Sequence, residues 1–410
     1  MRKKVFRVVA VLLGVIIVGF FAVPFILSGI YNGQLSRISR EKFTLPTDFV
    51  LPDSRIIAVG SATHGNAEPY EVTLELLKKV YYEHGSTAFI LEENVGAAEI
   101  INECHSFLDE NGRKLGFYTI YDNKEMDSIL LWLKQSNQRL YGIDIQTIST
   151  IVSLLNDDLD TLGFPDISKI PNLPVYKDYE IKQNLPLLKE IEDFLLAKKN
   201  INMITEQKYC YLSHLVDCIR MNYDYISSGS SFEVRDEAMA KNTEWVMEYE
   251  REFYNNDYAV LLASNGHVMK SNLDEKFSGR SYKTLGVYLD YAYDDEYYVI
   301  LTDANENYFM ADHNRNAQLN ITTCHVVSST PPTLFGNSGY NYVFFDEEKL
   351  ISNEIDTWNL TVIGHSWMWW WAINMDYKYQ ISLPEASDAL LFFEYMTPMN
   401  YNNRQIYVSH

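Results

Sequence analysis

The chain has 410 residues, of which 47% are apolar and 22% are charged. These proportions are close to those of ordinary globular proteins, and they disfavour a disordered chain, a collagen and a multi-span membrane protein. Acidic residues outnumber basic residues by 55 to 34, which gives a formal net charge of −21. Because nucleic-acid binding relies on cationic side chains that displace counterions, we expect no nucleic-acid partner.

The first feature along the chain is an uncharged apolar run over residues 8–27. In helical form, at about 1.5 Å per residue, it matches the ~30 Å core of a bilayer. Cations precede the run (Arg2, Lys3, Lys4 and Arg7), and none follows until Arg37. The positive-inside rule then predicts a cytoplasmic tail over 1–7, a transmembrane signal anchor over 8–27, and a single-pass cell-membrane protein whose domain lies outside. A cleaved signal peptide is the alternative, but the run is long and no A-x-A site follows it.

Residues 28–53 are polar and contain glycine and proline, which is typical of a stalk. From residue 54 to 410 we expect one α/β domain. Its first strand is the apolar run 55–60, its first helix extends from Pro69 to Gly85, and its second strand covers 87–92. Proline in the first helical turn and glycine after the last are the usual boundary signals, so this segment reads as a βαβ unit.

Further short apolar runs predict strands at 139–143, 258–263, 297–301, 342–345, 360–363 and 389–393. A block over 148–253 instead has apolar residues at helical spacing, and we interpret it as a helical insertion. Continuous apolar strands separated by helices indicate a largely parallel central sheet flanked by helices on both faces.

In such sheets, ligands bind beyond the carboxyl ends of the strands. The polar residues expected there are His64, Glu68, Glu92, Asp144, Asn265 and His267. Histidine has a pKa of about 6.5 and can take a proton from water, so the group is suited to general acid–base catalysis.

Structural rather than catalytic roles stay open for these residues. His64 and His267 could cap a turn and a helix, and Glu92 could form a structural salt bridge. Two histidines and a carboxylate also form a common metal-ligand set, but they lie on separate elements, and the four cysteines show no CxxC spacing. The aromatic run at 367–371 either packs in the core or forms a stacking wall for a ligand.

Six segments, in order along the chain, resemble the erythromycin esterase family, which hydrolyses macrolide lactones. They are Gly60–Gly65 with Glu68, Ala88–Glu92, Gly142–Gln146, Arg235–Asn242, Asn265–Val268 and Ser387–Leu391. The resemblance implies that His64 is the general base for water and that Glu92 and His267 line the cleft. It also implies a site without metal, so we expect no cofactor. On the helix predicted at 232–253, Arg235 and Asn242 share one face, which directs the arginine toward the cleft unless it is solvated.

The chain departs from the family pattern at three polar positions. Ser61 stands where the family usually has glutamate, Thr73 where it has arginine, and Ser264 where it has histidine. Losing a carboxylate that orients a histidine, and a cation that could hold an oxyanion, is expected to reduce catalysis.

Our leading hypothesis is a membrane-anchored, extracytoplasmic hydrolase that adds water to a small-molecule ester or lactone. We expect His64 to deprotonate the water and Glu92 to orient or polarise the imidazole of His64. His267 with Arg235 is expected to contact the carbonyl or the oxyanion. Four residues are predicted to bind substrate: Glu68, Asp144, Arg235 and Asn265. The alternative is a non-catalytic surface binding or accessory protein with a degenerate esterase-like pocket.

Overall fold

The computed structural model describes residues 2–38, 42–46, 49–104, 118–174, 177–274, 280–312, 321–327, 341–346, 356–364, 366–367 and 377–402. Its strands are β1 (Ile56–Ser61), β2 (Ala88–Asn94), β3 (Arg139–Asp144), β4 (Ala259–Ser264), β5 (Leu273–Asp274), β6 (Ser281–Tyr282), β7 (Tyr297–Asp312), β8 (Ile321–Val327), β9 (Tyr342–Asp346), β10 (Thr357–Thr361), β11 (Lys378–Ser382) and β12 (Ala389–Met396).

The helices are α1 (Arg2–Leu35), α2 (Glu68–His84), α3 (Val95–Cys104), α4 (Lys124–Ser136), α5 (Ser149–Leu162), α6 (Asp178–Asn200), α7 (Glu206–Ser227), α8 (Phe232–Tyr254), α9 (Asn265–Val268), α10 (Leu285–Tyr293) and α13 (Leu383–Ala386). Short 3₁₀ turns lie at Thr119–Tyr121, Ile167–Asn172 and Asp294–Glu296.

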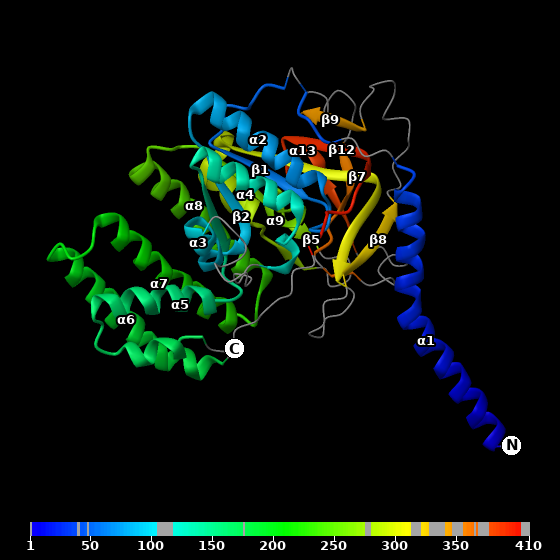
Figure 1. Cartoon of the computed structure of the whole chain (residues 1–410), viewed down its shortest axis with the longest axis horizontal. Helices are drawn as coiled ribbons and strands as arrows, with labels where there is room; N and C mark the ends of the chain where they lie inside the picture. The colour runs from blue at the N-terminus through cyan, green and yellow to red at the C-terminus, as the bar shows by residue number, and fades with distance from the viewer. Residues whose placement is uncertain are drawn as a thin grey trace.

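The central sheet has the order β3-β2-β4-β1-β7-β12-β9, with β8 paired to β7 (Figure 1). All pairs from β3 to β12 along this order are parallel, and β9 and β8 are antiparallel to their neighbours. The predicted α/β fold with a largely parallel sheet is therefore confirmed.

Alternate residues of β1 serve two separate cores. Ile57 and Val59 belong to the cluster that also contains side chains of α2 and α4. Ile56 and Ala58 belong to the cluster that contains side chains of α8 and α10. Because both faces of the sheet are covered, the strand is apolar at every position rather than at every second one.

The helical block between β3 and β4 consists of α5, α6, α7 and α8. Leu155, Leu188 and Leu215 lie in a third core cluster, to which Ala238 of α8 also contributes. The helix α8 then packs against β3 and β2. This helix connects the block to the sheet, and it brings Arg235 to the sheet's carboxyl edge.

Two of the predicted strands differ from those observed. The run 360–363 does not form a strand of the central sheet, because β10 ends at Thr361 and forms a two-stranded antiparallel sheet with β11. The strand predicted at 297–301 continues to Asp312, since the second half of β7 pairs with β8. The partner strands in these pairings, β8 and β11, were not among the strands predicted from the sequence.

Figure 1 shows α1 extending away from the body of the molecule, with only its C-terminal end against β8. There, Thr323 Oγ1 donates to Asn32 Oδ1 at 2.9 Å, and the ring of Tyr31 lies 5.2 Å from that of His325. In the part of the chain that the structure describes, no helix combines the length and apolar character needed to cross a membrane. The transmembrane signal anchor predicted over 8–27 is thus not supported, and the stalk and domain boundaries remain predictions.

The packing of α10 on α9 depends on glycine. A Cβ atom at Gly286 would lie 2.1 Å from Val268 O and 2.3 Å from Met269 O, both of them backbone atoms. Such contacts cannot be relieved by a side-chain rotation.

We therefore expect Gly286→Ala to lower the free energy of unfolding by about 1–3 kcal/mol, the usual effect of overpacking. Gly364→Ala is the control, because a Cβ there meets nothing within 4 Å. Denaturant midpoints of the two variants and the parent check this; equal midpoints for Gly286→Ala and the parent would contradict it.

Candidate active site

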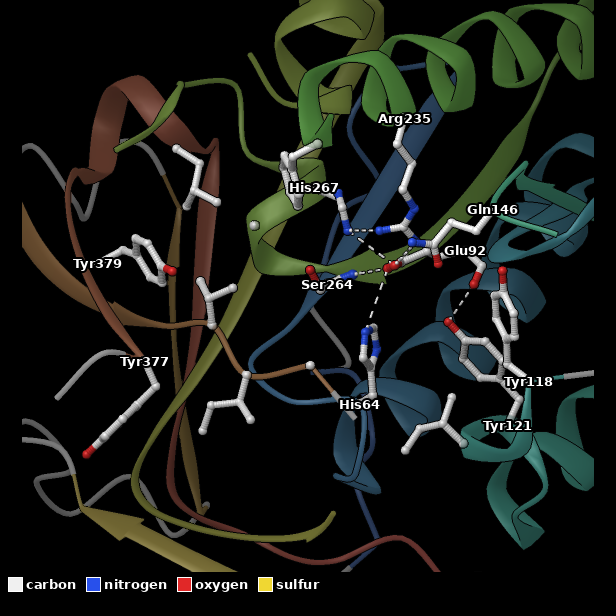
Figure 2. A pocket seen from close by; sticks show the side chains of 17 residues that line it. His64, Glu92, Tyr118, Tyr121, Gln146, Arg235, Ser264, His267, Tyr377 and Tyr379 are labelled. Carbon is white, nitrogen blue, oxygen red and sulfur yellow. Dashed lines mark hydrogen bonds and ion pairs between the residues drawn. The ribbon is translucent and has the colours of Figure 1, made fainter. Parts of the chain in front are cut away.

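A cavity of about 750 Å³ opens at the carboxyl ends of β1, β2 and β4 (Figure 2). This volume lies in the range of sites that enclose small organic ligands. Its walls are formed by His64, Glu92, Tyr118, Ile120, Tyr121, Gln146, Phe232, Arg235, Ser264, Gly266, His267, Leu273, Val362, Ile363, Gly364, Tyr377 and Tyr379.

The parallel register explains why residues distant in sequence meet there. Ser61 at the end of β1 is level with Ser264 at the end of β4, and β2 pairs with the other side of β4. His64 therefore follows β1, Glu92 lies near the end of β2, and His267 follows β4, all on one edge. The structure brings these three predicted residues into one cavity, while their catalytic roles remain predictions.

Glu92 is the centre of the site and is 5% exposed. Its Oε1 accepts from Arg235 Nη2 at 2.9 Å and lies 3.2 Å from His267 Nε2. Its Oε2 accepts from the backbone N–H of Ser264 at 3.0 Å and lies 4.0 Å from His64 Nε2. Burial raises the pKa of this carboxyl, but His267, His64 and Arg235 outweigh burial and hold the pKa well below its ordinary value. Glu92 is therefore ionised, with Oε1 against Arg235 and His267 and Oε2 directed toward His64.

His267 is held between two carboxylates. Its Nδ1 lies 2.9 Å from Asp236 Oδ2, which also accepts from the backbone N–H of Leu285 at 2.8 Å. The ring of Phe232 stacks on the imidazole with centroids 4.8 Å apart. Burial lowers the pKa of His267, but Asp236 and Glu92 outweigh it and raise the pKa to about 10. The two carboxylates therefore favour the charged form of the imidazole, with one carboxylate facing each ring nitrogen.

Arg235 reaches the site from the first turn of α8. Its Nε and Nη2 donate to the two oxygens of Asp144 at 3.0 and 2.7 Å, a bidentate pair, while Nη2 also binds Glu92. Tyr118 donates its hydroxyl proton to Asp144 Oδ2 at 2.9 Å. Figure 2 shows the guanidinium directed toward Glu92 and His267, and the side chain is 11% exposed, so the arginine is not on a solvated surface.

Three residues predicted to bind substrate instead position other groups. Asp144 is fully buried and clamps Arg235 rather than lining the cavity. Both oxygens of Glu68 accept from the backbone N–H of Thr397, at 2.8 and 2.9 Å. Asn265 donates from Nδ2 to Thr302 O at 2.8 Å and Thr361 O at 3.0 Å. None of the three is among the residues that line the cavity, because their polar atoms bind the protein itself, and their predicted role in substrate binding stays a prediction.

Several residues that form the site were not predicted from the sequence. Asp236 sits beside Arg235 on α8, where a carboxylate resembles any solvated helix charge. Tyr121 donates its hydroxyl proton to Glu92 O at 2.9 Å, and its segment lacks any periodic pattern. Tyr379 lies in β11, which was not predicted, and Tyr377 directly precedes that strand. Gln146 lay within a segment that was recognised but was given no role.

The three positions that depart from the family pattern have different surroundings. Ser264 lines the cavity and holds Glu92 through its backbone N–H. Ser61 is buried at 5% exposure. Thr73 is fully buried and donates its hydroxyl proton to Pro69 O of its own helix at 2.7 Å, so it does not face the cavity.

His64, Glu92 and His267 do not fit a metal site. Both ring nitrogens of His267 already face carboxylates, Nδ1 at 2.9 Å from Asp236 Oδ2 and Nε2 at 3.2 Å from Glu92 Oε1. Among the described residues, no group of three or more His, Cys, Asp or Glu side chains is arranged to hold a metal ion. Of the aromatic run at 367–371, Trp367 packs in a core cluster, and the remaining positions lie outside the described residues.

The fold and site define an α/β protein with a histidine–carboxylate cleft at the carboxyl edge of a parallel sheet. The chain belongs to the erythromycin esterase family, whose profile, described as erythromycin esterase, matches residues 178–396. This confirms the resemblance read from the sequence. The match begins in α6, so it includes Arg235 and His267 but not β1 or β2. For His64 and Glu92, membership of the site therefore rests on their position in the cavity.

Solved structures show the same fold. A Bacillus cereus protein is 20% identical with a TM-score of 0.69, over 85% of this chain and 90% of its own. A structure described as a succinoglycan biosynthesis protein is 17% identical with a TM-score of 0.64, over 85% and 90%. A mutant of the erythromycin esterase EreC in its open conformation is 14% identical with a TM-score of 0.58, over 86% and 93%. No functionally curated protein matches the chain.

The raised pKa of His267 makes stability depend on pH in a defined direction. The imidazolium stabilises the folded state fully below about pH 6.5, and this contribution is lost as the pH rises through about 10. We expect the His267 ring to stay protonated at pH 7 in an NMR titration and to titrate at lower pH in Asp236→Asn. A ring that titrates near 6.5 in the parent would contradict this.

Proposed function

We propose that this protein hydrolyses a carboxylic ester or lactone by adding water that His64 activates. The observation that carries the proposal is the arrangement of the cavity: both nitrogens of His267 lie against carboxylates, whereas His64 Nε2 lies 4.0 Å from Glu92, beyond hydrogen-bond distance. Asp236 and Glu92 raise the pKa of His267, and the lowered pKa of Glu92 makes it a weak base. The pKa values of Tyr118 and Tyr121 are raised, mainly by burial, so these hydroxyls keep their protons. His64 is the described acid–base side chain in the cavity best suited to accept a proton.

The placement of His64 suits that role. Its side chain is 13% exposed, against 5% for both Glu92 and His267. Figure 2 shows it pointing across the cavity floor toward Glu92. The 4.0 Å to Glu92 Oε2 is longer than a hydrogen bond, so the carboxylate acts on His64 through its charge. This charge favours the imidazolium that forms when His64 takes the proton.

Hydrolysis then takes place in two steps, addition of water and release of the alcohol. The water oxygen bonds to the carbonyl carbon as its proton moves to His64, and the carbonyl oxygen becomes an oxyanion. Arg235 Nη1, which binds neither Asp144 nor Glu92, lies 3.1 Å from His267 Nε2, so two cations border the space where that charge develops. When the tetrahedral intermediate collapses, the alcohol leaves with the proton from His64, and a carboxylic acid remains.

Removing the base tests the proposal. We expect His64→Ala to lower kcat/KM for ester hydrolysis by about 10²–10⁴-fold, the usual contribution of a general base, without changing the fold. The control is His84→Ala at the end of α2, an exposed histidine remote from the cavity. Turnover on a panel of esters and lactones, with circular dichroism of each variant, provides the measurement. Undiminished hydrolysis by His64→Ala would exclude the mechanism.

A binding protein with the same pocket is the second candidate, and Ser61 and Ser264 favour it because they replace reactive side chains. It predicts no turnover of any ester, together with thermal stabilisation by ligand that survives His64→Ala. Hydrolysis that appears only after Ser61→Glu and Ser264→His would identify a degenerate site.

We also propose that α1 attaches the protein to the cell membrane with the domain on the outer side. The support is a set of apolar side chains between 46% and 66% exposed, which are expensive to leave in water: Val9, Val11, Leu12, Leu13, Val15, Ile16, Ile17, Val18, Phe25, Ile26 and Ile30. The cations before this segment favour a cytoplasmic N-terminus.

Fractionation of cells tests this attachment. We expect the parent to sediment with membranes and to be digested by protease added outside, and the double variant Ile16→Lys, Ile17→Lys to be released. Ile201→Lys, which changes an apolar residue 64% exposed on the body, is the matched control and is expected to stay bound. Release of the parent would refute the attachment.

A further inference from the structure

The cavity has two walls of different chemistry. The charged groups Glu92, Arg235 and His267 gather where β2, α8 and α9 meet. The opposite wall has no acid or base other than tyrosine among the described residues: Leu273, Val362, Ile363, Gly364, Tyr377 and Tyr379. Figure 2 shows Tyr377 and Tyr379 across the cavity from Arg235 and Gln146, with His64 between them.

Most of the uncharged wall belongs to β10, β11 and the residues beside them, which we call the β10–β11 hairpin (357–364 and 377–382). These strands form a two-stranded sheet of their own, so they do not share the ladder of the central sheet. The position of this wall therefore depends on separate contacts.

One buried carboxylate supplies many of those contacts. Asp303 of β7 is fully buried. Its Oδ1 accepts from Thr361 Oγ1 at 2.7 Å, and its Oδ2 accepts from Trp358 Nε1 at 3.0 Å and from Thr361 N at 3.2 Å. Lys378 Nζ lies 3.9 Å from Oδ2 and donates to Thr361 Oγ1 at 2.5 Å. A single side chain thus binds both strands of the hairpin.

The hairpin is also joined to the loop that carries His64. Ile363 N donates to Ala62 O at 2.9 Å, two residues before the histidine. Asn265 Nδ2 donates to Thr361 O at 3.0 Å, from the start of the helix that carries His267. The distance between the apolar wall and the proposed base is therefore set by the protein rather than by the ligand.

We propose that the β10–β11 hairpin is the wall that selects the substrate's apolar group and that Asp303 is its positioning residue. The substrate is then an ester or lactone with an extended hydrocarbon portion beside the carbonyl. The catalytic part of this inference rests on the proposed hydrolysis. Burying one more methylene strengthens binding by about fourfold, so the wall is expected to favour longer chains until it is filled.

The test is hydrolysis of a series of p-nitrophenyl esters from acetate to decanoate. For the parent we expect kcat/KM to rise along the series. In Asp303→Asn the ratio of kcat/KM for decanoate to kcat/KM for acetate should fall by about tenfold, through a higher KM for decanoate. The loss of one charge-assisted contact has about that effect. The kcat for acetate should stay near that of the parent.

Glu250→Gln is the matched control. Glu250 is 1% exposed and binds Arg139 at 2.7 Å and Asn256 at 2.8 Å, at the opposite end of α8 from Arg235. It should keep the parent's chain-length preference even if it is less stable. If Asp303 had only a structural role, Asp303→Asn would lower kcat/KM for all the esters by the same factor. That result would overturn the proposal.

Two further measurements distinguish a failure of the proposed hydrolysis from a failure of the proposed apolar wall. If Asp303→Asn does not fold, Val362→Ser changes the wall itself and should remove the same preference. Thermal stabilisation of His64→Ala by the decanoate ester, larger than by the acetate ester, would support the wall without any turnover.

If the parent hydrolyses no ester but shows this stabilisation, only the proposed hydrolysis is contradicted. If the parent hydrolyses esters of all chain lengths equally, the proposed wall is contradicted. A macrocyclic lactone of equal carbon number separates cyclic from linear substrates.

Discussion

The site depends on how the buried carboxylate of Glu92 is shared. One oxygen is bound by two cations, Arg235 and His267, and the other faces His64. A buried carboxylate is costly unless it is paired, and here the pairing also decides protonation. The cations keep Glu92 charged, and the charge of Glu92 raises the pKa of His267. Because of this coupling, His64 becomes the site's candidate base.

The cations need partners of their own, and these extend the cluster into the fold. Asp144 at the end of β3 holds Arg235, and Asp236 holds His267. Asp236 in turn accepts from the N–H of Leu285, at the start of α10. These contacts link the charged residues of the cavity to the central sheet, to α8 and to α10. A change in any of these elements reaches Glu92 through one to three contacts.

The sequence could predict the strands and their common edge, because apolar runs such as Ile56–Ser61 are buried on both faces and leave a clear pattern. It could also place His64, Glu92 and His267, since parallel strands open on one edge. It could not assign Glu68, whose partner Thr397 is 329 residues away. Nor could it find the Asp303 contacts, because a carboxylate inside a strand gives no sign of the hairpin that it binds.

The departures at Ser61 and Ser264 remove side chains that the family pattern supplies, but they do not release Glu92. The backbone N–H of Ser264 holds the oxygen that faces His64, and backbone donors do not depend on the side chain. Across 4.0 Å, a unit charge pair at an effective dielectric of about 20 interacts by roughly 4 kcal/mol, and the nearby cations reduce this. A site that has lost two polar side chains therefore still has an electrostatic partner for its proposed base.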